Sequence, residues 1–206
     1  MTGRGVDEQT LMTGLARALR TELIAVGASQ GTIVVACIGT DRSTGDALGP
    51  LVGESLLRLG ASPDMVLGNL REPVHALNLD RVARRISNVD RPTVIAVDAA
   101  LGPADEIGSI RVRRGGLRPG AGVGKQLPTV GDISVTAIVN VSGEGSDAQV
   151  LQSTRLYVVQ ELAGLIAAAL WWAITETRVA PTSPVPRRSR FVRRSAEAPA
   201  APVLTR

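Results

Sequence analysis

The stretch Thr-Ile-Val-Val-Ala-Cys-Ile at residues 32–38 decides the fold class. A short, continuous apolar run rich in β-branched residues is typical of a strand that is buried on both faces. The turn-rich stretch 39–45 follows it, and helical periodicity resumes over residues 47–59, with apolar side chains at Leu48, Leu51, Val52, Leu56 and Leu59. A buried strand, a loop and a helix in this order predict the first unit of an α/β sheet.

The same alternation continues along the rest of the chain. Further strands are predicted at residues 65–69, 93–97, 109–112 and 133–141, and further helices at residues 10–26, 76–87 and 153–175. We expect the third strand to stop at Asp98, and the more polar strand 109–112 to lie nearer an edge. These spacings predict a three-layer α/β sandwich with a mainly parallel sheet and helices on both faces.

The 206 residues suit one domain with extensions at its ends. We expect an N-terminal helix within residues 1–30 that packs on an α/β domain of residues 31–177, and a disordered tail over residues 178–206. The tail contains seven arginines and one glutamate, so residues 1–177 carry a net charge of −2 although the whole chain carries +4. Such a tail suits either an electrostatic arm for nucleic acid or an acidic surface, or a solvated extension without a dedicated role.

Two features bear on the compartment of the protein. Cys37 is the only cysteine and lies in an apolar run, which predicts a buried hydrophobic side chain and allows no disulfide within the chain. No secretory signal pattern opens the sequence, so we expect a cytoplasmic protein. The uncharged run 162–174 is shorter than the roughly 20 residues that span a bilayer, which favours a buried core helix over a membrane anchor.

Acidic and glycine-rich residues follow several of the predicted strands, where parallel sheets bind ligands. Asp41 and Asp46 follow the first strand, Asp98 follows the third, and the glycine-rich stretch 117–125 follows the fourth. Each has a structural alternative: Asp46 suits a helix N-cap, Asp98 suits a turn, and the glycines can simply shape a loop. The glycine pattern matches neither the dinucleotide fingerprint nor the phosphate loop.

Taken together, the two aspartates indicate acid–base chemistry. Carboxylates at the ends of neighbouring strands can share one proton, which gives one acid and one base in a single site. The helix that follows Asp46 favours its charged form, whereas Asp98 leaves an apolar strand and is the expected holder of the proton. We therefore predict Asp46 as the base that activates water and Asp98 as the acid that protonates a leaving amine.

Several uncommon motifs then point to a family. They are Ile-Gly-Thr-Asp-Arg-Ser-Thr-Gly-Asp-Ala-Leu-Gly-Pro (38–50), Glu-Pro-Val-His-Ala-Leu-Asn-Leu (72–79), Pro-Gly-Ala-Gly-Val-Gly-Lys (119–125), Leu-Pro (127–128), Val-Gly-Asp-Ile-Ser-Val-Thr (130–136), Ile-Val-Asn (138–140) and Leu-Gln-Ser-Thr-Arg-Leu (151–156). Over residues 30–170 the chain resembles the YyaC family of proposed spore proteases. That family is similar to the germination protease of spores and, more distantly, to hydrogenase maturation proteases, which implies a phosphorylase/hydrolase-like fold.

The resemblance implies an atypical aspartic-type endopeptidase of the forespore cytoplasm. The segments 46–50 and 97–99 are similar to the two segments that bear the catalytic aspartates of the germination protease. The implied substrates are small acid-soluble spore proteins or the germination protease precursor, and no cofactor or membrane is expected. The residues expected to bind substrate are Asp41, His75, Gly122, Gly124, Lys125 and Asp132. Asp41 and Asp132 also stand as substitutes should Asp46 or Asp98 be structural.

The hydrogenase maturation proteases bind a metal through two acids and a histidine after a later strand. Residues 115–128 contain no histidine here, and the only one in the chain, His75, follows a different strand. We therefore expect no metal, and His75 is either at the edge of the site or at the start of a helix. Two alternatives remain open: an inactive relative that binds a sporulation protein through the same site, and a metal-dependent maturation-type peptidase.

Overall fold

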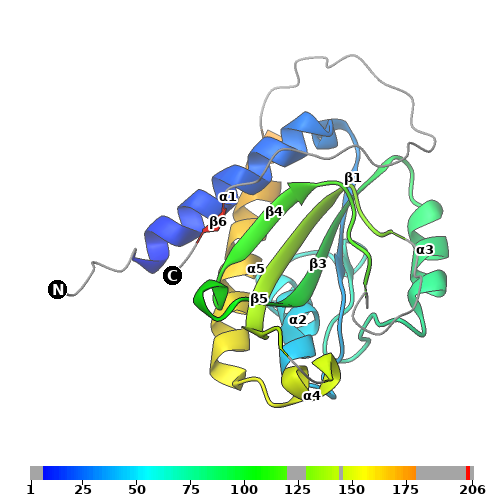
Figure 1. Ribbon diagram of the computed structural model, residues 1–206. Coiled ribbons are helices and arrows are strands. Elements are labelled where there is room, and N and C mark those ends of the chain that lie inside the picture. Colours follow the sequence, from blue (N-terminus) through cyan, green and yellow to red (C-terminus); the bar gives the residue numbers. More distant parts are fainter. Residues whose placement is uncertain (1–6, 120–128, 144–145, 180–202, 205–206) are drawn as a thin grey trace.

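The computed structural model describes residues 7–119, 129–143, 146–179 and 203–204. Its centre is a sheet with the strand order β2-β1-β3-β5-β4-β6 (Figure 1). The strands are β1 (Thr32–Cys37), β2 (Val66–Leu67), β3 (Pro92–Gly102), β4 (Ile110–Arg114), β5 (Ile133–Val141) and β6 (Val203–Leu204). The first four in the spatial order are parallel, whereas β4 is antiparallel to β5 and β6 is antiparallel to β4. The predicted mainly parallel sheet is confirmed, and β4 lies near its edge.

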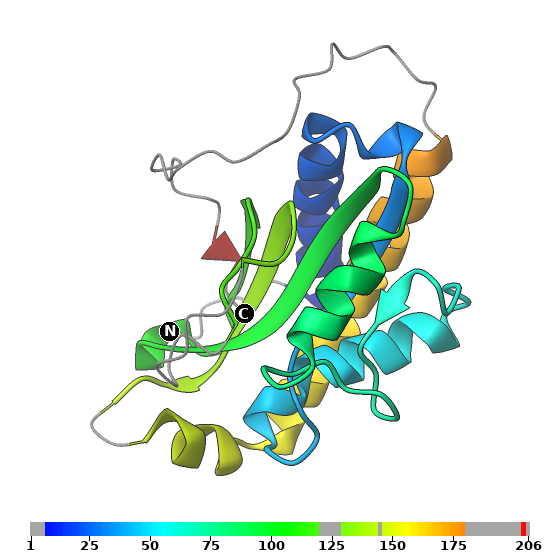
Figure 2. The same ribbon diagram turned by 90° about the vertical axis from the view of Figure 1, so that its right-hand side faces the viewer.

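Helices cover both faces of this sheet. α1 (Glu8–Ala25), α2 (Leu48–Arg58) and α5 (Leu156–Val179) lie on one face, and α3 (Leu79–Ser87) lies on the other (Figures 1 and 2). The short helix α4 (Asp147–Gln152) and the single turns η1 (Ala28–Gln30), η2 (Gly45–Ala47) and η3 (Ala104–Glu106) connect the larger elements. The arrangement is the three-layer α/β sandwich that the alternation of strands and helices predicts.

The core has a larger and a smaller half, one on each face of the sheet. In β1, Ile33 and Val35 belong to the half under α1, α2 and α5, whereas Val34 and Ala36 belong to the half under α3. Alternate residues of one strand thus meet different helices, which is why the whole run is apolar. Cys37 is fully buried in the larger half, and this burial raises the pKa of its thiol, as expected of a structural cysteine.

The helix α2 approaches the sheet very closely. A Cβ atom on Gly49 would lie 2.0 Å from the Ile38 carbonyl oxygen, and one on Gly53 would lie 1.9 Å from that of Gly68. Only glycine fits at these two positions, because any larger residue would push the helix away from the strands. This close contact fixes the start of α2, and with it η2 and Asp46, against the carboxyl end of β1.

The helix α5 is long and apolar enough to cross a membrane by length and composition, but half of its most apolar window is buried inside the domain. Its side chains Ile166, Leu170 and Ile174 lie in the larger core, so α5 packs as the core helix that the sequence predicts. It extends to Val179 and so includes Arg178, which we expected in the tail. The predicted disorder of the tail concerns residues that lie mostly outside the described ones, although Val203–Leu204 forms β6.

Candidate functional site

Asp98 lies within β3 and does not end it. The predicted strand end at residue 97 is wrong, because β3 continues to Gly102 and pairs with β5 over its last residues. Asp98 is in register with Thr136 of β5, so their side chains lie side by side on the face of the sheet that α3 covers. The alternative of Asp98 as a turn residue is therefore also wrong.

Asp46 lies in η2, between the loop that follows β1 and the start of α2. The Thr40 backbone N–H donates to the Asp46 carbonyl oxygen at 3.0 Å, which closes the loop into a tight turn. Gly39 permits this turn because its φ is 139° and a Cβ atom there would lie 1.9 Å from the Asp46 carbonyl oxygen. No side chain caps the start of α2, so the alternative of Asp46 as an N-cap is wrong.

His75 lies beside the same loop. Val74 forms a parallel bridge with Ile38 and its carbonyl oxygen accepts the Gly39 N–H at 2.7 Å, which brings the segment after β2 against the end of β1. The Leu77 N–H donates to His75 Nδ1 at 3.3 Å, so the proton of the neutral ring lies on Nε2. His75 is thus in the turn before α3, at the edge of the site, which was one of the two alternatives from the sequence.

The two aspartates and the histidine form a chain of electrostatic interactions. Burial raises the pKa of Asp98 well above its ordinary value, and the negative charge of Asp46 raises it further, against a smaller lowering by the Ala99 N–H. Burial also raises the pKa of Asp46, but a Thr40 backbone hydrogen bond and the positive charge of His75 oppose this shift. The site therefore favours a protonated Asp98 next to an ionised Asp46.

The structure separates Asp132 from this pair. Its Oδ2 accepts the Val94 N–H at 3.0 Å, and its own N–H donates to the Val94 carbonyl oxygen at 2.7 Å. Val94 precedes Asp98 by four residues in β3, which corresponds to about 13 Å along a strand. Asp132 therefore lies toward the amino-terminal end of the parallel strands. Asp41 is exposed in the loop after β1, the same loop that leads to Asp46.

The glycine-rich segment does not leave from the end of the sheet that we expected. β4 is antiparallel to β5, and the chain beyond it returns through the Leu117–Val130 bridge toward the amino-terminal end of the parallel strands. The assumption that this segment follows the carboxyl end of a parallel strand is therefore wrong. The predicted binding residues Gly122, Gly124 and Lys125 themselves lie outside the described residues.

Two residues near the pair escaped the sequence reasoning. Thr136 places a hydroxyl beside Asp98, and the alternation of polar and apolar residues in 133–141 could have indicated that it faces away from the larger core. Asn78 orders the turn around His75, because its Oδ1 accepts the His75 N–H and its Nδ2 donates to the Pro73 carbonyl oxygen, both at 2.9 Å. An asparagine just before a helix is a common cap, so its position in the sequence alone does not indicate this other role.

The donor types of Asp46, Asp98 and His75 would suit a divalent metal, but their arrangement does not. Within the described part of the chain, no group of three or more His, Cys, Asp and Glu side chains is placed to hold a metal ion. His75 Nδ1 already accepts the Leu77 N–H.

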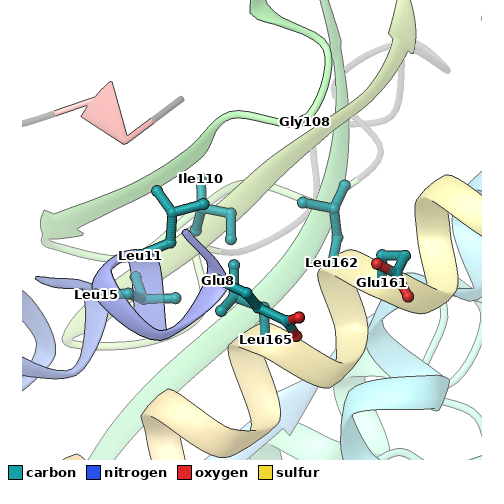
Figure 3. Close-up of a pocket in the computed structure, with 8 residues that line it drawn as sticks. All are labelled: Glu8, Leu11, Leu15, Gly108, Ile110, Glu161, Leu162 and Leu165. Carbon is teal, nitrogen blue, oxygen red and sulfur yellow. The ribbon is translucent and has the colours of Figure 1, made fainter. Parts of the chain in front are cut away.

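A small apolar pocket elsewhere in the domain takes no part in this site. It lies between α1, the start of β4 and α5, and its volume of about 20 Å³ is room for about one water molecule (Figure 3). Its lining consists of Glu8, Leu11, Leu15, Gly108, Ile110, Glu161, Leu162 and Leu165. Ile110 belongs to the larger core, so the pocket is on the face of the sheet opposite to Asp98.

Comparisons with known proteins identify the family. Residues 5–169 match the model of the family described as "Protein of unknown function (DUF1256)". The chain is 50% identical over 139 residues to "Uncharacterized protein YyaC" of Bacillus subtilis strain 168, which covers 67% of each protein.

Two solved structures are also similar in part. One is the [NiFe] hydrogenase maturation protease HycI from Thermococcus kodakarensis KOD1, with 22% identity, a TM-score of 0.45, and coverage of 78% of this chain and 97% of the other. The second is a peptidyl-tRNA hydrolase in complex with N-propanol, with 12% identity, a TM-score of 0.37, and coverage of 75% and 98%. With TM-scores below 0.5, neither likeness indicates an activity. The family assignment rests on the sequence matches, and the chain belongs to the DUF1256 family together with YyaC, as its motifs predict.

Proposed function

We propose that this protein is a peptidase that hydrolyses a peptide bond in a protein substrate, with Asp46 as the base and Asp98 as the acid. One observation carries the proposal. Two partly buried carboxyl groups interact at the carboxyl edge of the sheet, and their surroundings favour the proton on Asp98 and the negative charge on Asp46. Different surroundings for two neighbouring carboxyl groups are the usual basis for one acid and one base in a single site.

In the proposed reaction, the Asp46 carboxylate accepts a proton from a water molecule as the water oxygen attacks the peptide carbonyl carbon. The Asp98 carboxyl group then donates its proton to the leaving amine nitrogen as the C–N bond breaks. The products are a carboxylic acid and an amine, and the proton on Asp46 returns the pair to its starting state by transfer to Asp98. The Ala99 N–H, which donates to Asp98 Oδ1 at 2.9 Å, orients the acid.

His75 supports the base in this scheme. Its positive charge acts to lower the pKa of Asp46, against the larger raising effect of burial, and so favours the ionised form of this carboxylate. In the neutral ring, Nδ1 accepts the Leu77 N–H, whereas in the charged ring both nitrogens carry protons and this hydrogen bond is absent. We assign His75 as a positioning and electrostatic residue that acts through Asp46.

The proposed substrates are proteins of the forespore cytoplasm, either small acid-soluble spore proteins or the germination protease precursor. Membership of the YyaC family supports this choice, through the resemblance of residues 46–50 and 97–99 to segments of the germination protease. The experiment is incubation of the purified protein with each substrate, followed by mass mapping of the fragments.

The variants Asp46→Asn and Asp98→Asn test the assignment of the pair. Each should lower cleavage about 10²–10⁴-fold, because asparagine can neither accept nor donate the proton at neutral pH. Asp132→Asn is the matched control and should cleave at the wild-type rate. Undiminished cleavage by either site variant would refute the mechanism. Cleavage that is lost on chelation and restored by Ni²⁺ or Zn²⁺ would favour the metal-dependent peptidase. Substrate binding without cleavage would favour the inactive binding protein.

A further inference from the structure

We infer that Leu77 is a substrate-contact residue, which receives an apolar side chain of the polypeptide next to the bond that is cleaved. The inference rests on the proposed function and adds a chemical preference to it. It starts from an unusual exposure: the Leu77 side chain is 83% exposed, compared with 60% for Tyr157 and 56% for Leu156, the next most exposed large hydrophobic residues in the described part of the chain.

A single exposed leucine does not by itself indicate a binding site, because apolar atoms cover much of every protein surface. The hydrogen bonds around Leu77 show that the turn on which it lies is ordered. Besides the three hydrogen bonds of His75, Leu77 and Asn78 already described, the Asn78 N–H donates to the His75 carbonyl oxygen at 3.0 Å. The same connection contains a second such turn, in which Asn69 Oδ1 accepts the N–H groups of Arg71 and Glu72 at 2.8 and 2.9 Å.

These bonds fix the turn before any substrate arrives. A residue on a fixed turn loses little further backbone freedom when it binds, so the contact retains more of its binding free energy. Leu77 is therefore held out to solvent by a turn that is already ordered.

The turn also places Leu77 beside the chemistry. Its N–H is bonded to the ring of His75. The Val74 carbonyl oxygen, one residue before His75, accepts the Gly39 N–H at 2.7 Å, and the N–H of the next residue, Thr40, donates to the Asp46 carbonyl oxygen at 3.0 Å. The Cα atoms of residues 75 and 77 can be at most about 7 Å apart, since each peptide unit spans 3.8 Å. A polypeptide whose carbonyl carbon lies at Asp46 and Asp98 would therefore bring a side chain one or two residues away within reach of Leu77.

The experiment uses a library of peptides obtained by digestion of a bacterial proteome, with mass spectrometry of the cleaved products. Wild-type protein should prefer an apolar residue at one fixed position next to the cleaved bond. Leu77→Ala should weaken this preference and lower kcat/KM for the best peptides about tenfold, mainly through KM, because a hydrophobic contact acts on binding. Since Leu77 is exposed, the variant should keep the wild-type melting temperature.

Leu59→Ala is the matched control. Leu59 is 45% exposed and follows α2, which begins two residues after Asp46 and runs toward the opposite end of the sheet, so this variant should keep both the preference and kcat/KM. An unchanged preference in Leu77→Ala, or an equal loss in Leu59→Ala, would overturn the inference.

A binding measurement separates this inference from the proposed function. Immobilised Asp46→Asn protein, with and without Leu77→Ala, is exposed to the same library and the retained peptides are sequenced. If wild-type protein cleaves no peptide, the proposed function fails, but apolar enrichment that disappears with Leu77→Ala would still support the contact. Retention that does not depend on Leu77 would overturn it.

Discussion

Two aspartates lie along the paired strands β3 and β5, Asp98 within β3 and Asp132 just before β5, and they are held in different ways. Asp132 exchanges hydrogen bonds with Val94 and so joins the two strands where their pairing begins. Asp98, four residues after Val94, has the negative charge of Asp46 as a neighbour in addition to the Ala99 N–H. A carboxylate that bonds the backbone of the adjacent strand serves the fold, whereas one placed beside a second carboxylate raises the energy of the ionised site. The residue type alone does not distinguish the two roles.

The largest effect on stability is expected at Asp132, at the amino-terminal end of the parallel strands. Asp132→Ala leaves the Val94 N–H without its side-chain acceptor in a partly buried position, which should cost about 1–3 kcal/mol of unfolding free energy. Urea denaturation measures this loss. Asp132→Asn keeps an acceptor oxygen and should lose less, and cleavage by the folded fraction of both variants should stay at the wild-type level. A loss of cleavage with unchanged stability would place Asp132 in the site and remove the contrast.

Asp98→Asn is expected to raise the stability of the fold at neutral pH, whereas Asp132→Ala lowers it. The pKa of Asp98 is raised in the folded protein, so the folded state binds this proton more tightly than the unfolded chain does. The stability that results is fully present below the unfolded pKa near 3.8 and is lost as the pH rises through the folded pKa.

Asparagine avoids this loss because it never ionises. The melting temperature of Asp98→Asn should therefore exceed that of the wild type at neutral pH, by about 2–4 °C for each kcal/mol relieved, and the difference should shrink toward pH 4. Differential scanning calorimetry across this pH range measures the effect. A difference that does not change with pH would show that the charge on Asp98 carries no such cost.

The sequence was sufficient for the elements whose own pattern determines them. The run 32–38 is apolar on both faces and 133–141 alternates, so the two interior strands β1 and β5 were predicted within one residue at either end. The end of β3 was not, because Asp98–Gly102 form a strand only through their pairing with β5. The direction of β4 depends on the same strand and is equally absent from its local sequence.

In the candidate site too, some features follow from the local sequence and others depend on long-range pairing. Asp46 and Asp98 could be paired from the sequence, since both follow predicted neighbouring strands, and β1 and β3 are indeed adjacent. The place of His75 could not be derived, because it depends on the bridge between Ile38 and Val74. That bridge requires β2 to lie at the outer side of β1, a long-range arrangement that no spacing along the chain reveals.

The smallest effect is expected from His75→Gln, which tests whether His75, placed by that bridge, contributes to the chemistry. Cleavage requires an ionised Asp46, so its rate should rise as the pH increases through the pKa of Asp46. The positive charge of His75 lowers this pKa, and glutamine removes the charge, so the rising limb of the pH profile should move to higher pH. The rate on the plateau should change little, because glutamine touches neither proton transfer.

The pH profile of kcat/KM for one mapped peptide measures this displacement, with Asp132→Asn as the control whose profile should not move. A loss of rate that is equal at every pH would instead mean that His75 only supports the turn around Leu77. In that case the reactivity would come from Asp46 and Asp98 alone. The difference between Asp98 and Asp132 would then lie in the nearby carboxylate of Asp46, which acts on Asp98.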